Sequence, residues 1–206
     1  GGWNRTDMTT QTGETWIAMQ NGKSILISTV NQSWIELRNC GLSRAATGIN
    51  IGTGTTDAGQ YFRNFHAVGA LNPIVLRASF VHLIGAQASN GGVHGIDAST
   101  TEAARNIFLY EVSLNSNGQP SDGSGMRGGG LGVTGRNVTA KNNADFGIEF
   151  GPVAGSNFST PARMSNFISD NNTVGGTDCI NTNGIQFFNS LFGESSPFGT
   201  VGTSSY

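Results

Sequence analysis

Three charged residues stand directly after an apolar residue in short, similar segments of the sequence. They are Asp97 after Ile96, Arg127 after Met126 and Glu149 after Ile148. Two carboxyl groups can cleave a glycosidic bond when one donates a proton and the other activates water. An arginine between them could hold a carboxylate or hydroxyl group of a sugar. The pattern suggests Asp97 and Glu149 as catalytic residues and Arg127 as a substrate-binding residue.

A second interpretation of the same residues is structural. Asp97, Arg127 and Glu149 could form an exposed row of ion pairs, which typically adds less than about 1 kcal/mol per pair to stability. We also expect Arg127 to lower the pKa of both carboxyl groups, which suits a general base and works against a general acid.

Other polar residues compete for a role in catalysis or binding. Glu111 falls in an apolar run, where a partly buried carboxyl group would have the raised pKa of an acid catalyst, although it could equally face outward. Asp122 and Asp178 belong to the two longest loops, which would form the walls of a binding groove. We therefore take Glu111 as a third candidate catalytic residue and Asp122 as a substrate-binding candidate.

These residues can act together only if the chain brings them to one surface, and a loose repeat provides such a surface. A short apolar strand, a polar turn often containing asparagine, and a second strand led by Ile or Met recur about every 22 to 32 residues. Alternation at two residues, with no sustained helical stripe, indicates β-strands. The leading residues that should stack in one interior row are Ile49, Ile74, Ile96, Met126, Ile148 and Ile180.

The repeat predicts an all-β fold, a single-stranded right-handed parallel β-helix of about seven coils. The residue after each leading residue then points outward, and successive coils are about 4.8 Å apart. Asp97 and Glu149 would lie two coils, about 9.6 Å, apart, near the upper limit for an inverting glycosidase. A β-sandwich is the structural alternative, and it would require hairpins. The outward row reads Asn50, Val75, Asp97, Arg127, Glu149 and Asn181, and its last member is a further candidate for substrate binding.

The composition of the chain argues against several classes of binding partner. The 206 residues carry a net charge of −2, which provides no basic surface for nucleic acid, and no apolar run could insert into a membrane. His66, His82 and His94 lack metal-ligand spacing and are interpreted as surface or loop residues, so we expect no metal and no cofactor. Cys40 and Cys179 should remain thiols about five coils apart. The aromatic residues that could stack on sugars if they face outward are Trp16, Trp34, Tyr61, Phe62 and Tyr110.

The chain resembles the pectin-lyase-like β-helix superfamily, and within it the β-helix of bacteriophage tailspikes. The resemblance lies in an Asn-ended strand followed by a glycine-led strand, as at Asn39 with 48–51 and Asn142 with 147–150, and covers about residues 25–192. It implies one β-helix domain over residues 1–206. Because the sequence starts at Gly1 and its first methionine is Met8, we expect it to be part of a longer chain.

The resemblance also implies a function, namely a tailspike or fibre domain of the virion tail that recognises, and could degrade, a bacterial surface polysaccharide as a homotrimer. The enzyme would then be a glycoside hydrolase or a polysaccharide lyase. The alternatives are a free, secreted hydrolase, lyase or epimerase, and a non-catalytic adhesin of the cell surface. No clustered aspartates suggest the calcium site of the pectate lyases in this superfamily.

Overall fold

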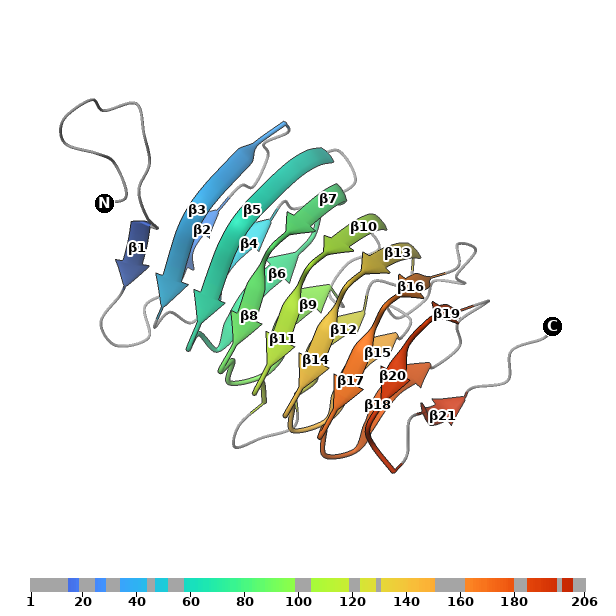
Figure 1. Ribbon diagram of the computed structural model, residues 1–206. Coiled ribbons are helices and arrows are strands. Elements are labelled where there is room, and N and C mark those ends of the chain that lie inside the picture. Colours follow the sequence, from blue (N-terminus) through green and yellow to red (C-terminus); the bar gives the residue numbers. More distant parts are fainter. Residues whose placement is uncertain are drawn as a thin grey trace.

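The computed structural model is built from parallel β-strands (Figure 1). It describes residues 15–18, 25–28, 34–43, 47–51, 58–98, 105–118, 123–128, 131–150, 162–179, 185–195 and 198–201. Every strand pairing in these ranges is parallel, so the hairpins of a β-sandwich are absent from the described part of the chain. The predicted parallel β-helix is thus confirmed.

Each coil contributes strands to three faces, and the first two faces belong to one 13-stranded sheet. The first face contains β7 (Ser79–Ile84), β10 (Arg105–Tyr110), β13 (Leu131–Arg136), β16 (Arg163–Ser165) and β19 (Gln186–Phe188). The second contains β8 (Gln87–Ser89), β11 (Ser113–Asn115), β14 (Thr139–Lys141), β17 (Ile168–Asp170) and β20 (Leu191–Phe192). The long strands β3 (Glu36–Ser43) and β5 (Ala58–Val68) run through both faces, and β1 (Thr15–Ala18) pairs with β3.

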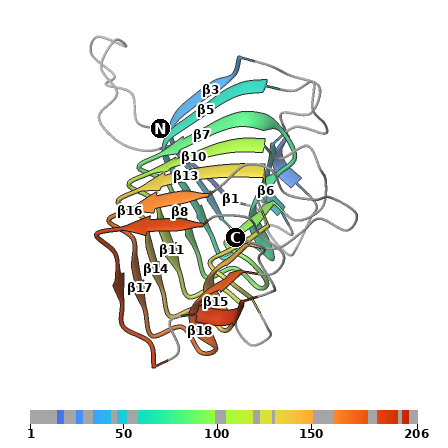
Figure 2. The ribbon, with the colours of Figure 1, turned by 90° about the vertical axis from the view of Figure 1, so that its right-hand side faces the viewer.

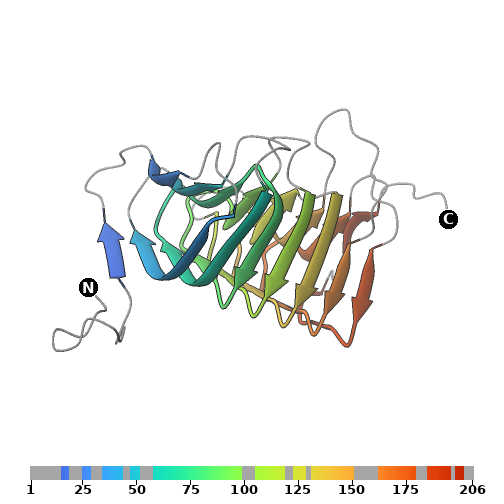
Figure 3. The same cartoon turned by 90° about the horizontal axis from the view of Figure 1, so that it is seen from above.

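The third face is a separate eight-stranded sheet. Its strands are β2 (Ile25–Ser28), β4 (Thr47–Ile51), β6 (Asn72–Leu76), β9 (Ile96–Ala98), β12 (Met126–Gly128), β15 (Phe146–Phe150), β18 (Gly175–Cys179) and β21 (Phe198–Val201). Strands β7 to β21 make five coils of three separate strands, and β1 to β6 precede them with fewer, longer strands, so the coil count differs slightly from seven. Successive coils follow one another in sequence order (Figure 3).

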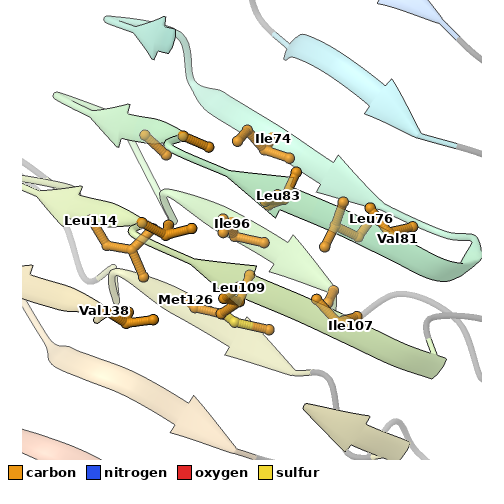
Figure 4. Close-up of a cluster of buried hydrophobic side chains, with 14 of the residues drawn as sticks. Ile74, Leu76, Val81, Leu83, Ile96, Ile107, Leu109, Leu114, Met126 and Val138 are labelled. Atoms are coloured by element: carbon orange, nitrogen blue, oxygen red, sulfur yellow. The ribbon is translucent and has the colours of Figure 1, made fainter. Parts of the chain in front are cut away.

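The core is a narrow column of stacked apolar residues. Ile49, Ile74, Ile96, Met126 and Ile148 pair in register on the third face and are fully buried, as predicted. Side chains from the other faces, such as Leu83 and Leu109, meet them across the coil (Figure 4). Each such burial contributes about 1.5–3 kcal/mol, so stability grows with the number of coils.

One prediction about this row is wrong. Thr177, and not Ile180, pairs with Ile148, and Thr177 is fully buried. Ile180 itself lies outside the described residues. Cys40 is a buried thiol in β3. The described residues contain no helix that could span a bilayer and no group of three or more His, Cys, Asp or Glu that could hold a metal ion.

Asparagines stabilise the corners between faces, as the sequence suggested. At the corner between the first and second faces, residues with positive φ include Asn39, Asn64, Asn137, Asn166 and Asn189. Asparagine tolerates this conformation better than most residues. The Asn166 amide donates to Asn137 Oδ1 at 2.9 Å, and the Asn189 amide donates to Asn166 Oδ1 at 2.8 Å.

A second row of asparagines is buried, at the corner between the second and third faces. Asn117 Nδ2 donates to Asn143 Oδ1 at 3.0 Å, and Asn143 Nδ2 donates to Asn172 Oδ1 at 2.7 Å. Asn172 Nδ2 donates to Glu194 Oε1 at 2.6 Å, so the row ends on a carboxylate. The Nδ2 atoms of all three asparagines also donate to backbone carbonyls, which satisfies polar groups that would otherwise be costly to bury. The row therefore links successive coils at the corner that precedes the third face.

Candidate functional site

The outer side of the third face carries a polar row in register. Asp97 pairs with Arg127, Arg127 with Glu149, and Glu149 with Asp178. The sequence predicted the first three positions correctly. Asp178 takes the position given to Asn181, because Gly175–Cys179 forms β18 and the strand begins earlier than the Ile180 motif implied. Asn181 lies outside the described residues, and Asp178 is part of a strand instead of a loop.

Glu149 is held by two partners. Arg127 Nε lies 3.2 Å from its Oε1, and the Ser124 hydroxyl donates to its Oε2 at 3.3 Å. The side chain of Glu149 is only 13% exposed, whereas that of Arg127 is 49% exposed. The carboxyl group therefore lies at the base of the outer surface, with the guanidinium group above it in partial contact with water.

Burial is the largest influence on the pKa of Glu149. It raises the pKa of the carboxyl group above its ordinary value, while Arg127 lowers it, Asp145 raises it, the Ser124 hydrogen bond lowers it and Asp178 raises it. The net direction is upward. Arg127 lowers the pKa of Glu149, as expected, but the loss of solvent outweighs this one half-exposed cation. A raised pKa is the property required of a general acid near neutral pH.

His94 lies beside this pair and is 6% exposed. Its Nδ1 accepts a hydrogen bond from the Ser124 backbone N–H at 3.0 Å, and its Nε2 is 3.5 Å from Arg127 Nη1. A ring nitrogen that accepts carries no proton, so the neutral ring has its proton on Nε2. Burial lowers the pKa of His94, Asp97 raises it and Arg127 lowers it further, with a net decrease that keeps the ring neutral at pH 7.

The arrangement can bind an oxygen-rich ligand and move a proton. The Arg127 guanidinium and His94 Nε2–H are donors on one surface, which suits a carboxylate or hydroxyl group of a sugar. Glu149 can donate a proton, and Asp97, in register on the other side of Arg127, offers a second carboxyl group about two coil steps, or 9.6 Å, away. These are the components that acid–base cleavage of a glycosidic bond requires.

His94 and Ser124 were not identified as site residues from the sequence. Each lies three residues before its partner, Asp97 or Arg127, and residues three apart in a regular strand point to opposite sides. The chain bends at Gly95 and Gly125, which precede the leading residues. A Cβ on Gly125 would meet Gly147 O at 2.5 Å and the core Leu114 Cβ at 3.0 Å, so Gly125 and the buried Met126 both face inward. Two consecutive inward positions bring Ser124 and Arg127 to the same side. Polar residues directly before the repeated glycines are the signal that could have found them.

The fold is similar to that of a solved polysaccharide epimerase module. Compared with the A-module of the mannuronan C-5 epimerase AlgE6 from Azotobacter vinelandii, the TM-score is 0.60 at 15% sequence identity, over 92% of this chain. The chain corresponds to 57% of the length of that module. This likeness shows a shared parallel β-helix fold. No protein-family model matches the chain, and no curated protein matches its sequence.

The remaining predicted site residues are not brought to this cluster. Glu111 is exposed at the corner after β10, with a φ of 57°, and belongs to the other sheet. Glu111 is exposed at this corner although Val112 after it is buried, so a partly buried acid at this position is ruled out. Asp122 lies outside the described residues. The third-face cluster, by which we mean His94, Asp97, Ser124, Arg127 and Glu149, is the candidate site.

Proposed function

We propose that this protein binds a bacterial surface polysaccharide along the third face and cleaves it by acid–base catalysis. The observation that carries the proposal is Glu149, a largely buried carboxyl group with a raised pKa, held by Arg127 and Ser124 in register with Asp97. Burial stabilises the protonated form that a general acid needs. A glycan is also the kind of ligand named for the structurally similar epimerase module, which acts on mannuronan.

In the proposed reaction, Glu149 protonates the glycosidic oxygen and Asp97 activates water on the opposite side of the sugar. The separation of about 9.6 Å leaves room for that water and predicts inversion at the anomeric carbon. Arg127 and His94 Nε2–H hold a carboxylate or hydroxyl group of the sugar and so orient the bond to be cleaved. Arg127 and His94 thus position the substrate, and the two carboxyl groups transfer the protons.

The test is the release of reducing ends from a panel of capsular and O-antigen polysaccharides. Glu149→Gln and Asp97→Asn should each lower kcat about 10²- to 10⁴-fold, since each removes one proton-transfer group. The second face supplies a matched control, because Lys141 Nζ and Asp170 Oδ2 also form an ion pair at 3.2 Å, but on an exposed surface. Asp170→Asn should keep parental activity. Equal activity in the parent, Glu149→Gln and Asp97→Asn would disprove the assignment.

A second candidate reaction is epimerisation or β-elimination at a uronic acid, for which the paired donors Arg127 and His94 could neutralise the carboxylate. Epimerisation predicts no new reducing ends, whereas elimination releases a reducing end on one product and a double bond on the other. Epimerisation would instead incorporate solvent deuterium at the carbon next to the carboxylate, and elimination would form an unsaturated sugar. NMR of the product distinguishes these outcomes from hydrolysis with inversion.

The location and the oligomeric state of the protein are also part of the proposal. The tailspike resemblance of the Asn-ended and glycine-led strands suggests a homotrimer in a virion tail, whereas a secreted enzyme or a cell-surface adhesin would carry the same face. Sedimentation of the purified protein tests the trimer. A monomer that cleaves polysaccharide would favour the secreted enzyme, and binding without turnover would favour the adhesin.

A further inference from the structure

The outer surface of the first face carries an aromatic ridge. Tyr61, His82 and Phe108 pair in register on β5, β7 and β10. Adjacent rings are parallel within 9°, and their centroids are 4.4 Å apart at both contacts. This separation is close to the distance between coils, so the three rings form one stack along the axis and expose their edges. Each ring of the ridge therefore stacks face to face on its neighbour.

Arginines flank this ridge at both ends. Four arginines and one glutamate occupy the two outward rows of the face, although the chain as a whole has a net charge of −2. Figure 2 shows β5, β7, β10, β13 and β16 of this face side by side. One row reads Glu36, Tyr61, His82, Phe108, Thr134, Arg163 and Gln186, and the other reads Arg38, Arg63, Ile84, Tyr110, Arg136, Ser165 and Phe188.

The arginines at the two ends of the aromatic ridge differ in whether they form ion pairs. Arg38 and Arg63 each lie 2.8 Å from Glu36. Arg136 and Arg163, on the adjacent strands β13 and β16, are exposed, and neither forms an ion pair with another described residue. From β5 to β13 is three coil steps, about 14 Å. A ligand along the axis would therefore meet cationic groups at both ends of the aromatic ridge.

Trp34 adds a platform at the edge of the same face. It is 79% exposed and has a φ of 60°, a conformation that is strained for a bulky side chain. A Cβ on Gly59 would lie 2.5 Å from the indole Cε3, so the ring lies against the glycine backbone and only a glycine leaves room for it. One side of the indole is covered by the chain, and the other is open to solvent. A sugar ring can stack on such a surface.

We propose that the first face is a second polysaccharide-binding surface, specific for an anionic glycan strand and separate from the third-face cluster. Arginine pairs well with carboxylate and sulfate groups because its planar donors match their geometry. The indole and the ring edges contact the sugar rings between those groups. A glycan held on the first face would keep the substrate concentrated near the third face by multivalent attachment.

The charges argue against a second copy of the chain as the occupant. A two-fold symmetric contact places the same patch of both copies face to face. Since arginines stand at both ends of the ridge, either orientation of the partner would bring guanidinium groups together. An anionic glycan relieves this repulsion, whereas self-association increases it.

Binding of short oligosaccharides to the whole chain tests the proposal by isothermal titration calorimetry. The probes are oligomers of mannuronate, galacturonate and chondroitin sulfate, with a neutral dextran of equal length as the reference. We expect at least one anionic probe to bind a site whose affinity falls with added salt, while dextran does not. The double variant Arg136→Gln/Arg163→Gln should weaken this site about tenfold per arginine, and Trp34→Ala should weaken it less.

Two further variants assign the binding to a face. Lys141→Gln removes a cation from the second face and should leave binding unchanged, and Arg127→Gln should abolish only binding at the third face. Circular dichroism melts show that each variant is folded. Binding that is unchanged in the double variant would overturn the proposal, as would loss of all binding in Arg127→Gln. It would also be overturned if the parent sediments as an oligomer that the double variant converts to a monomer.

Discussion

Two glutamates of this protein, Glu36 and Glu149, lie beside arginines at similar distances, and their pKa values shift in opposite directions. On the first face, Glu36 lies 2.8 Å from Arg38 and from Arg63 on an exposed surface, and its pKa is lowered, with the Arg38 hydrogen bond as the largest cause. On the third face, Glu149 lies 3.2 Å from Arg127 and its pKa is raised. Burial is the largest cause of the raised pKa of Glu149, and Asp145 and Asp178 raise it further, whereas two arginines act on Glu36. A nearby arginine by itself does not tell whether a carboxyl group will serve as an acid.

The largest effect on stability should come from a substitution at Gly125, the glycine at the corner beside the third-face cluster. Gly125→Ala would place a Cβ 2.5 Å from Gly147 O, a backbone atom that cannot move aside cheaply. We expect the free energy of unfolding to fall by about 2–3 kcal/mol, measured by urea denaturation. Gly69→Ala is the contrasting variant, because Gly69 has open space and a φ of 68°, and it should cost only about 1 kcal/mol. Equal losses would mean that the corner is not sterically closed.

The next effect is the change in the pKa values of Glu149 and Glu36 when a neighbouring arginine is removed. Arg127→Gln should raise the pKa of Glu149 further, since Arg127 opposes the effect of burial, whereas Arg38→Gln should return the pKa of Glu36 toward its ordinary value. Carbon-13 NMR of the two carboxyl groups measures both. A Glu149 pKa at or below the ordinary value in the parent would remove the difference between the two faces, and with it the case for Glu149 as the acid.

The smallest effect is the acid dependence of stability. The pKa of His94 in the folded state is lowered from 6.5, so its contribution is present above about pH 6.5 and is lost as the pH falls through the folded value. His94→Gln should reduce the loss of melting temperature between pH 7 and pH 5. His82, on the first face, also has a lowered pKa, through burial and Arg63, but is more exposed, so His82→Gln should have a smaller effect. The reverse order would contradict the greater burial of His94.

The sequence predicted the fold and most of the register, because the apolar row is regular from Ile49 to Ile148. It failed at β18, where a buried threonine, Thr177, occupies the position of an isoleucine and no hydrophobic pattern reveals it. His94 and Ser124 escaped notice because a glycine corner interrupts the alternation. Phe62, considered as a sugar-stacking residue, is fully buried. The raised pKa of Glu149 depends on burial that spacing alone does not give.

The buried asparagine row has an electrical consequence. Asn117, Asn143 and Asn172 all donate in the same direction along the coil axis, and Glu194 accepts the last hydrogen bond. Strand dipoles largely cancel in a sheet, but these side-chain amides are aligned and polarise one another. The row is a one-way chain of dipoles whose positive ends point toward an anion. Removal of the Glu194 carboxylate would therefore weaken hydrogen bonds up to three coils away, so the order of the middle of the β-helix depends on an anion in the C-terminal coil.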